Sequence, residues 1–486
     1  MLLNLKKEFE KQPAIQKLSA PEKAAAYTYF LKNLSLKLHK FYEGKTKTSV
    51  KVPLTDKDLF DLWYTPGVSA VSLEIKKEQQ ESFPCTNRGN RVAIVSDSTR
   101  VLGDGDCGPS GGLGVMEGKA LLMNYLGGLD AVHLCIDSTD EQGRKSVKKI
   151  IDFVMMVAPS FAAINLEDIS QPNCFFALEE LRKNCSIPVW HDDAQGTACI
   201  ITAGLINALK LVNKKIENIK VVLIGAGAAN TTVARFLLLS GVNPKNLIMF
   251  DSKGALSRKR QDLKASPTSF VQWQLCTATN SGQIQTKEKA FKNADVVIAL
   301  SKSGPNTFDP KLLTLMAEKP IAFLCANPVP EIYPEVAKEH GAFIIATGRG
   351  DYPNQVNNSL CFPSILKGAL LCRAKTITDT MALAASKAIA KRAQDLGLKQ
   401  DFILPLMQDE EVYPLTAKYV AAQAIKEGIN QIKITPAEVY RKVKHDIEQN
   451  KKELAVLNAK GLIKKLPQEL IKKALAETVT YARNKK

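Results

Sequence analysis

Two pairs of neighbouring acidic residues, Glu167-Asp168 and Asp192-Asp193, carry the clearest chemical signal in the sequence. Each pair follows a short apolar run of the kind that forms a buried strand. A single acidic residue in such a place more often caps a helix or faces the solvent. Two pairs at successive strand ends instead favour a metal site, because carboxylate oxygens are the ligands that Mg²⁺ and Mn²⁺ prefer.

A glycine-rich stretch forms a second candidate site. The sequence Gly-Ala-Gly-Ala-Ala-Asn at 225–230 follows an apolar run and precedes a helical pattern, and Asp251 ends the next apolar run. Such glycines let the backbone turn tightly and approach a pyrophosphate at a helix N-terminus, and the later acid can reach the ribose. Asn230 stands where Gly or Ala is usual, and we expect it to loosen helix–strand packing. The cofactor residues assigned here are Gly225, Gly227, Ala228, Ala229, Asn230, Asp251, Ser252 and Lys253.

A parallel sheet is needed to bring these residues together. Short strand-like runs alternate with helical patterns over residues 91–190 and again over residues 220–346, which is typical of βαβ units. Ligands of such sheets bind beyond the carboxyl ends of the strands, so the acidic pairs should line one edge. Residues 6–39 are expected to be helical with a break near Pro21. Residues 96–114 are expected to form a glycine-rich loop before a helix at 116–125.

The fold class predicted from this order is α/β, with three parts. Residues 1–196 form a parallel α/β domain for substrate and metal, and residues 197–360 form a Rossmann dinucleotide-binding domain. Residues 361–486 form a helical segment that packs back on the first domain.

Composition narrows the class of protein. The chain has 486 residues, of which 45% are hydrophobic and 24% charged, as in ordinary globular proteins. The longest uncharged apolar stretch, 194–209, is shorter than the roughly 18 residues that cross a bilayer. Ten scattered cysteines without a C-x-x-C pair suit reduced thiols, and we expect a cytoplasmic protein.

The net charge of +17 suggests an anionic partner. Residues 441–486 hold 13 Lys and Arg against 5 Asp and Glu, a net +8, in a segment without a nucleic-acid-binding motif. We therefore expect neither a nucleic acid nor a membrane as partner. The charge helps at most to attract acidic metabolites, and solvated lysine-rich helices explain it equally well.

Seven motifs in order extend from about residue 60 to 375. They are Tyr64-Thr65-Pro66-Gly67, Ser96-Asp97-Ser98-Thr99-Arg100-Val101-Leu102-Gly103, Met116-Glu117-Gly118-Lys119-Ala120, Glu167-Asp168-Ile169, His191-Asp192-Asp193-Ala194-Gln195-Gly196-Thr197, Ala326-Asn327-Pro328 and Gln355-Val356-Asn357-Asn358. In these motifs the chain resembles the malic enzymes, in the shorter form of bacteria and some protists. The resemblance implies oxidative decarboxylation of L-malate to pyruvate and CO₂ with a nicotinamide cofactor and Mg²⁺ or Mn²⁺.

The resemblance also implies roles for single residues. Lys119, expected at a helix start, matches the general base, and a desolvated lysine can have its pKa lowered for that role. Asp192 would orient Lys119, Tyr64 would protonate the enol, and Arg100 would grip a substrate carboxylate. The metal ligands would be Glu167, Asp168 and Asp193; Asn327 and Asn358 would hold the substrate, and Asn327 would also contact the cofactor. By resemblance we expect a homodimer in which Tyr64 completes the site of the neighbouring subunit.

The choice between NADP and NAD depends on the residues around Asp251. A carboxylate there favours the free 2′-hydroxyl of NAD. Ser252, Lys253 and the cationic run 258–260 follow, however, and the sequence at 251–254 looks like that of NADP users in the family. We therefore favour NADP and keep NAD as the alternative. Two rival functions stay open: another nicotinamide-dependent dehydrogenase for amino or hydroxy acids, and a basic nucleic-acid-binding protein.

Overall fold

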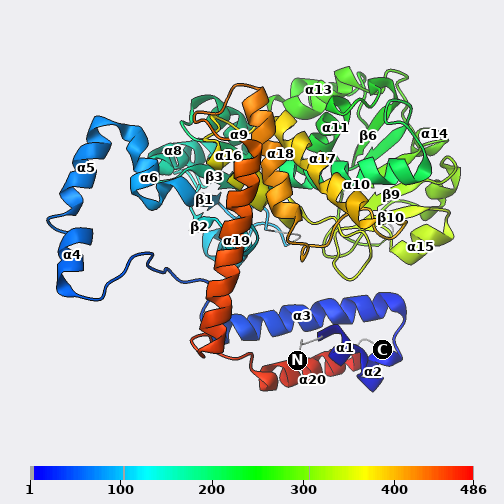
Figure 1. Cartoon of the computed structure of the whole chain (residues 1–486). Coiled ribbons are helices and arrows are strands. Elements are labelled where there is room, and N and C mark those ends of the chain that lie inside the picture. The colour runs from blue at the N-terminus through cyan, green and yellow to red at the C-terminus, as the bar shows by residue number, and fades with distance from the viewer. Residues whose placement is uncertain (1–4, 102–103, 306, 485–486) are drawn as a thin grey trace. The chain divides into compact units, whose positions relative to one another are not determined.

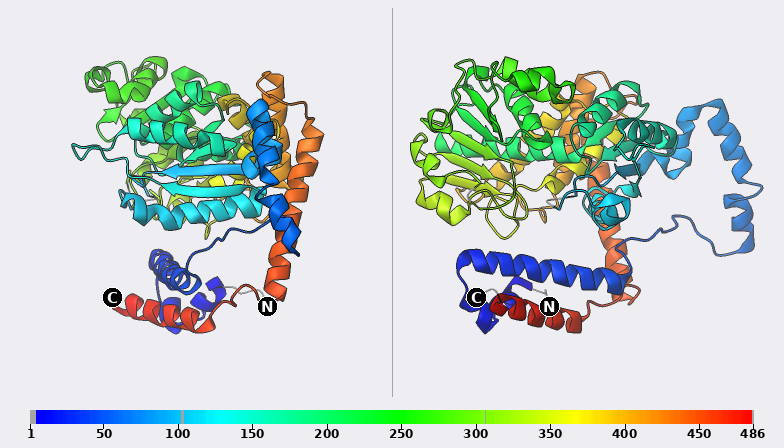
Figure 2. Two further views of the ribbon diagram at one scale, coloured as in Figure 1. Left: turned by 90° about the vertical axis from the view of Figure 1, so that its left-hand side faces the viewer. Right: turned by 180° about the vertical axis from the view of Figure 1, so that it is seen from behind.

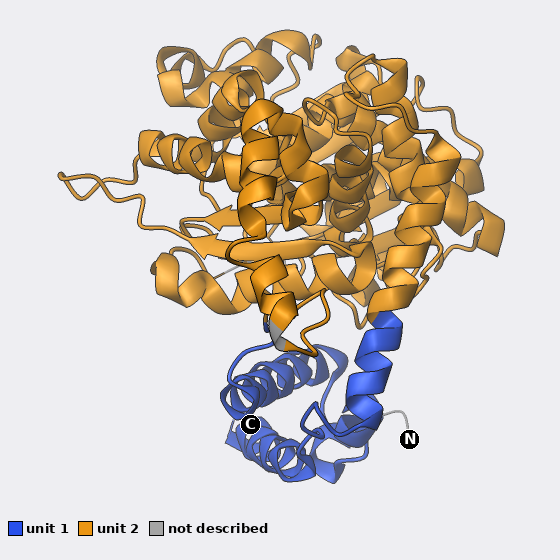
Figure 3. Cartoon of the chain, turned by 60° about the vertical axis from the view of Figure 1, so that its left-hand side comes forward, with its two compact units in different colours: residues 1–47, 451–486 blue, residues 48–450 orange. Residues whose placement is uncertain are grey.

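The computed structural model describes residues 5–101, 104–305 and 307–484, so Leu102 and Gly103 of the second motif lie outside the described residues. The chain forms two compact units (Figure 3). Unit 1 consists of residues 1–47 and 451–486, and unit 2 of residues 48–450. The two ends of the chain, which the three-part division assigned to different domains, therefore share one unit.

Unit 1 is helical. Its elements are α1 (Leu5–Glu10), α2 (Pro13–Gln16), α3 (Ala20–Tyr42), the last turns of α19 (Pro436–Ala459) and α20 (Gln468–Asn484). Apolar side chains from both chain ends are buried together, among them Phe9, Phe30, Leu34, Ile471 and Leu475. This shared core explains why distant segments associate in one unit.

A helical break occurs near Pro21 as predicted, and a second one precedes it. The breaks occur at residues 11–12 and 17–19, and Pro21 lies in the first turn of α3. Proline is tolerated there, because its missing N–H would have no partner within the helix. Ser19 caps α3 in a reciprocal pair with Glu22.

Unit 2 contains a four-stranded parallel sheet in the order β2-β1-β3-β4. The strands are β1 (Arg91–Ser96), β2 (Asp130–Cys135), β3 (Ala163–Leu166) and β4 (Val189–His191). The connecting helices are α7 (Gly108–Gly127), α8 (Val147–Val157) and α9 (Asn173–Asn184). Helices cover both faces of the strands (Figure 2), as expected for a buried parallel sheet.

A six-stranded sheet follows in the order β10-β9-β8-β5-β6-β7, parallel except for β7. Its strands are β5 (Val221–Ile224), β6 (Leu247–Asp251), β7 (Gly254–Ala255), β8 (Val296–Ala299), β9 (Ile321–Leu324) and β10 (Ile344–Thr347). The strand order reverses at β5, which is the switch point where such sheets bind dinucleotides. The predicted α/β class with a Rossmann domain is confirmed.

Helices join and surround the two sheets (Figure 1). Those of the Rossmann region are α10 (Thr197–Val212), α11 (Ala228–Leu239), α12 (Gln261–Ala265), α13 (Phe270–Ala278), α14 (Lys287–Phe291) and α15 (Pro334–Glu339). Those after it are α16 (Phe362–Leu371), α17 (Asp379–Leu396), α18 (Val412–Lys426) and α19. The region after residue 361 is helical as predicted, and α16 packs against α7 and α18.

The glycine-rich stretch before Lys119 differs from the expected loop. Helix α7 already begins at Gly108, with Pro109 in its first turn, and so includes Gly111, Gly112 and Gly114. Gly112 is buried against β1, because a Cβ there would lie 1.9 Å from the hydroxyl oxygen of Ser98. Gly112 thus serves close packing, whereas a Cβ at Gly114 would meet nothing within 4 Å.

One segment, Asp192–Val212, is long and apolar enough to cross a membrane by composition alone. However, 78% of its most apolar window is buried inside the protein. This segment is therefore the central core helix α10 together with the turn that precedes it.

An arm with α4 (Lys57–Trp63) and α5 (Val68–Lys77) precedes the short helix α6 (Ser82–Cys85) and the first strand. The arm stands away from the rest of unit 2 (Figures 1 and 2). It exposes large apolar side chains, with Phe60, Leu62 and Leu73 each more than half exposed.

Candidate active site

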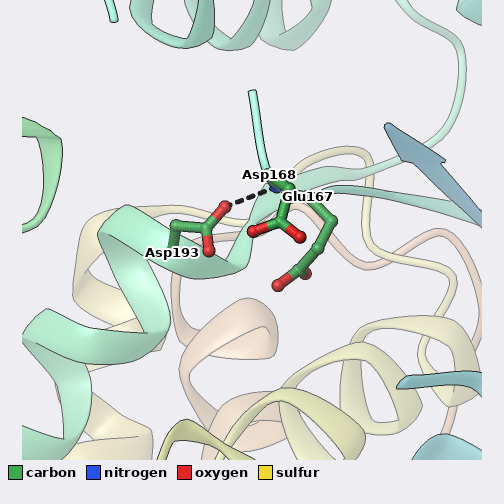
Figure 4. Close-up of side chains that lie close together, drawn as sticks. All are labelled: Glu167, Asp168 and Asp193. Carbon is green, nitrogen blue, oxygen red and sulfur yellow. Dashed lines mark hydrogen bonds between the residues drawn. The ribbon is translucent and has the colours of Figure 1, made fainter. Parts of the chain in front are cut away.

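Three carboxylates meet at the carboxyl edge of the four-stranded sheet. Glu167 and Asp168 follow β3, and Asp193 lies in a π-helical turn, Asp192–Gly196, that follows β4. Because β3 and β4 are parallel neighbours, the two acidic pairs lie side by side. One ligand oxygen from each of the three side chains lies within 4.8 Å of the others (Figure 4). Asp193 also accepts a hydrogen bond from the backbone N–H of Asp168 at 2.7 Å.

Lys119 reaches this cluster from α7. Its Nζ lies 2.5 Å from Oδ2 of Asp192 and 2.8 Å from Oε1 of Glu167, and the side chain is only 10% exposed. The ammonium also lies 4.2 Å from the centre of the Phe362 ring. Lys119 is the twelfth residue of α7 and not at a helix start, so the helix interior fixes its direction.

Asp192 is held by three donors. Besides Lys119, the indole Nε1 of Trp190 donates to Oδ1 at 3.0 Å and the amide of Asn358 donates to Oδ2 at 2.7 Å. Gly196 leaves room for this carboxylate, because a Cβ there would lie 2.1 Å from Oδ1 of Asp192. Trp190 and Gly196 were missed in the sequence. Trp190 lies two residues before Asp192. Side chains two residues apart along a strand point to the same face, and that spacing was the signal that could have indicated Trp190 as a neighbour of Asp192.

Buried charges perturb the pKa values of this cluster. Burial raises the pKa of Glu167 well above its usual value, although Lys119 opposes the shift, and burial also raises the pKa of Asp192. Burial by itself would lower the pKa of Lys119, but Asp192, Glu167 and Asp193 outweigh it, so the net pKa is raised. The expected lowering is wrong for this arrangement, because the carboxylates hold Lys119 in its charged form.

The donor set fits a divalent cation. Four carboxylates, those of Glu167, Asp168, Asp192 and Asp193, face one ammonium, so negative charge is in excess at a site closed to most of the solvent. Hard oxygen donors on two rigid strand ends are the ligands that Mg²⁺ and Mn²⁺ take. His191 is buried beside them, with Nε2 3.9 Å from Asp193, and burial lowers its pKa.

The glycine-rich loop forms one wall of a cavity of about 550 Å³, which Arg100 also lines. Gly225 has a φ of +99°, and a Cβ there would lie 2.4 Å from the carbonyl oxygen of Leu300, so only glycine fits. Helix α11 begins at Ala228 and presents its first N–H groups to this loop. Asp251 and Ser252 line the same cavity.

Asn230 has another effect than the one expected. Its side chain is buried, and its amide donates to the carbonyl oxygens of Ile224 and Gly225 at 3.1 and 2.8 Å. These bonds tie the helix to the end of β5. Asn230 therefore fastens the helix–strand contact that it was expected to loosen.

Asp251 is fully engaged at the end of β6. Its Oδ1 accepts from the backbone N–H groups of Lys253 and Gly254, and Arg260 grips both of its oxygens at 2.9 and 2.7 Å. Arg260 also holds Asp262. Lys253 is exposed, with Nζ 3.6 Å from Asp262.

Two predicted residues, Tyr64 and Asn327, are exposed. Tyr64 follows α4 on the arm and is 74% exposed, and the arm stands apart from β3 (Figure 1). Asn327 follows β9, is exposed, and packs against Gly348. Asn358, by contrast, is in the cluster as a partner of Asp192.

Family models match in two consecutive parts: "Malic enzyme, N-terminal domain" over residues 43–182 and "Malic enzyme, NAD binding domain" over residues 194–429. The crystal structure of the Entamoeba histolytica malic enzyme superposes with a TM-score of 0.96 at 48% identity, covering 99% of each chain.

Curated relatives differ in their cofactor. The NAD-dependent malic enzyme of Geobacillus stearothermophilus is 41% identical over 387 residues, 79% of this chain and 78% of that protein. The NADP-dependent malic enzyme of Escherichia coli is 37% identical over 426 residues, 84% of this chain and 54% of that longer protein.

Proposed function

This chain belongs to the malic enzyme family, and from that membership we propose that it converts L-malate and NADP⁺ to pyruvate, CO₂ and NADPH with a divalent metal ion. The observation that carries the proposal is the pair of Lys119 and Asp192 beside the carboxylates of Glu167, Asp168 and Asp193. A metal-free dehydrogenase has no use for that cluster.

Malate is a dicarboxylate and needs cationic contacts. Arg100 lines the cavity that the glycine-rich loop also lines, and its guanidinium can pair with a substrate carboxylate through two parallel bonds. Asn327 follows β9, where its amide would contact substrate and nicotinamide. Asn358 acts on malate through Asp192, because its amide is already bonded to that carboxylate.

Lys119 is the candidate base for the malate hydroxyl. The amine must first pass its proton on, and Asp192, in contact with Nζ at 2.5 Å, is the residue that can take or share it. When bound to Glu167, Asp168 and Asp193, a divalent cation supplies positive charge that polarises the hydroxyl and offsets the surrounding carboxylates. Gly225 and Gly227 would hold the dinucleotide, which would supply the hydride acceptor for malate.

Tyr64 is proposed as the acid that protonates the enol after CO₂ leaves. Its exposed position on the arm separates it from Lys119 of the same chain. We propose a homodimer in which the apolar arm packs on a second copy, and Tyr64 then enters the site of that copy. Phe60, Leu62, Trp63 and Val68 are between 39% and 56% exposed, and a contact between subunits would bury them.

NADP is proposed as the preferred cofactor because of the charges around the ribose site. The fork of Arg260 neutralises Asp251, the carboxylate that would otherwise repel a 2′-phosphate. Ser252 lines the cavity, and the exposed Lys253 can turn from Asp262 to the phosphate. Arg258 and Lys259 add further positive charge in the sequence just before Arg260.

One assay tests the function. Purified protein is incubated with L-malate, Mn²⁺ and NADP while NADPH absorbance and pyruvate are followed, with EDTA as control. We expect equal amounts of NADPH and pyruvate, and loss of both with EDTA. NADP reduction that is absent, or that EDTA leaves unchanged, contradicts the proposal.

The cofactor preference needs its own measurement. In Lys253→Ala, kcat/KM for NADP should fall about tenfold, the loss of one charged hydrogen bond, while kcat/KM for NAD changes little. Lys289→Ala, an exposed lysine of α14, is the matched control. Equal or better turnover with NAD at low concentration would reverse the preference.

A further inference from the structure

Most of the net charge of the chain lies in unit 1. Its 83 residues contain 20 Lys and Arg against 7 Asp and Glu, a net +13 of the +17 in the whole chain. Unit 2, with 403 residues, carries only +4. The positive charge is therefore the property of one small helical unit and not of the surface in general.

Unit 1 is separate from the catalytic residues. The family models begin at residue 43 and end at residue 429, so nearly all of unit 1 lies outside them. Every residue assigned to malate, metal or nicotinamide lies in unit 2. Unit 1 also has a buried core of its own, so it can fold as a separate compact unit.

One stretch of unit 1 combines positive charge with exposed apolar side chains. We call it the 451–465 segment; it forms the last turns of α19 and the loop that follows. Leu454, Val456 and Leu462 are 38%, 57% and 66% exposed. The segment has one acidic residue, Glu453, and the five lysines Lys451, Lys452, Lys460, Lys464 and Lys465.

The 451–465 segment is anchored to the rest of unit 1. The hydroxyl of Tyr42 donates to the carbonyl oxygen of Lys464 at 3.1 Å, and the Lys464 ammonium lies 5.4 Å from the centre of the Phe41 ring. The apolar and cationic side chains are thus presented by a folded support rather than by a loose tail.

Although the sequence alone favoured no membrane as partner, we propose that the 451–465 segment docks the protein on an anionic lipid surface. Leucine and valine side chains insert at the boundary between headgroups and acyl chains, while lysines pair with the negative headgroups. Both kinds of side chain are exposed here within fifteen residues, and the unit around them adds to the attractive field.

Two other partners fit these observations less well. Nucleic acid is usually bound with arginine forks and aromatic platforms. In unit 1 all cations but Arg483 are lysines, and Tyr29 stacks on Tyr481 with ring centres 4.2 Å apart. A second copy of unit 1 would bring together two units of +13, which repel each other.

Vesicle sedimentation with the full chain tests the proposal. We expect the protein to sediment with vesicles of phosphatidylcholine and phosphatidylserine, but not with phosphatidylcholine alone, and to be released by about 0.5 M NaCl, where charges are screened. The variant K452E/K460E/K464E/K465E should lose at least tenfold in binding, and Leu462→Asp should weaken binding without removing a lysine. Both should keep the activity with malate, which reports that unit 2 is intact, and the helical circular dichroism of wild type, which reports that unit 1 folds.

A variant with four exposed lysines of unit 2 replaced, K148E/K215E/K289E/K387E, is the matched control and should bind nearly as wild type. Equal sedimentation with neutral and anionic vesicles, or no sedimentation with either, overturns the proposal. So does an equal loss in the control variant. Retention of the protein on poly(U) without vesicle binding would assign unit 1 to nucleic-acid binding. A changed subunit number of K452E/K460E/K464E/K465E in light scattering would assign unit 1 to a contact between subunits. Either result overturns the lipid proposal.

Discussion

Asp192 accepts hydrogen bonds from three other residues of the proposed site. Its two oxygens accept from Lys119, Trp190 and Asn358, which come from a helix, a strand and a loop far apart in the sequence. Both oxygens of this buried carboxylate accept hydrogen bonds, which fix its orientation. The fixed carboxylate in turn fixes the position of the Lys119 ammonium. Changes at single residues of this network should therefore act on the rate more than on substrate binding.

Replacing Lys119 by Ala should lower kcat for pyruvate formation by about 10² to 10⁴-fold, because the base for the hydroxyl proton is lost. The measurement is the rate of NADPH formation from malate. Lys148→Ala, an exposed lysine of α8, serves as control. Normal activity of the Lys119 variant would exclude it from the mechanism.

Trp190→Phe should leave Oδ1 of Asp192 without its indole donor. We expect a lower free energy of unfolding by about 1 to 3 kcal/mol, since a buried acceptor loses its partner. As a positioning residue, Trp190 should affect kcat with little change in the KM for malate. Trp273→Phe, a tryptophan of α13 that packs against the core, is the control. A change confined to stability would show that Trp190 does not position the base.

Glu331 gives a prediction on pH. It is buried, accepts from the backbone N–H groups of Ser301 and Ala326, and its pKa is raised by burial. Because the folded-state pKa exceeds the unfolded one, the folded state binds the proton more tightly. The contribution of Glu331 to stability is full below the unfolded pKa and is lost as the pH rises through the folded pKa.

The free energy of unfolding of wild type relative to Glu331→Gln should therefore fall as the pH rises above about 4.3, by at most about 1.4 kcal/mol per pH unit. Urea titrations at several pH values measure this difference. A difference that grows with pH would contradict the raised pKa.

At the scale of elements, alternation of apolar runs and helical patterns was enough to predict both sheets. The strands extend from Arg91 to His191 and from Val221 to Thr347, within one residue of the predicted ranges, because their apolar periodicity is strong. The start of α7 was missed because four glycines argue against a helix on propensity alone. The contact with Ser98 explains Gly112, and that contact depends on the tertiary fold.

The candidate site, too, could be predicted only where it depends on local sequence patterns and topology. Strand-end acids predicted the carboxylate cluster, since parallel topology determines which strand ends meet. Lys119 and Asn358, which donate to Asp192, lie 73 and 166 positions from it, and Arg260 lies 9 positions from Asp251; local patterns do not encode side-chain directions across such separations. For the same reason the direction of the Lys119 pKa shift could not be predicted from its burial alone.

Two glycines of α7 should respond in opposite ways to alanine. Gly112→Ala should lower the free energy of unfolding by about 1 to 3 kcal/mol, because the new methyl group would overlap Ser98. Gly114→Ala, where a Cβ meets nothing within 4 Å, should raise it by up to about 1 kcal/mol through helix propensity. Urea denaturation followed by circular dichroism compares the pair, and equal effects would contradict the packing role of Gly112.

At the scale of the whole molecule, the arm separates Tyr64 from the other proposed catalytic residues. If subunits exchange their arms, Tyr64→Phe and Lys119→Ala damage different halves of a shared site. Mixing the two inactive variants after mild dissociation should then restore up to about a quarter of the wild-type activity, because half of the random dimers are hybrids with one intact site.

The control is each variant taken through the same dissociation alone, which should stay inactive. Leu62→Asp in the arm should shift the mass in light scattering from dimer to monomer. Mixed variants that stay inactive while the dimer forms would place Tyr64 outside the site of the partner.

The division of unit 1 between the two chain ends sets an order of events during synthesis. About 400 residues separate residue 47 from residue 451, so at about 5 to 20 residues per second a ribosome needs roughly 20 to 80 s between the two parts. During that time the apolar face of α3, with Phe30 and Leu34, has no α20 to cover it. The enzyme body can therefore mature first, and the cationic unit is completed only when the last helix has left the ribosome.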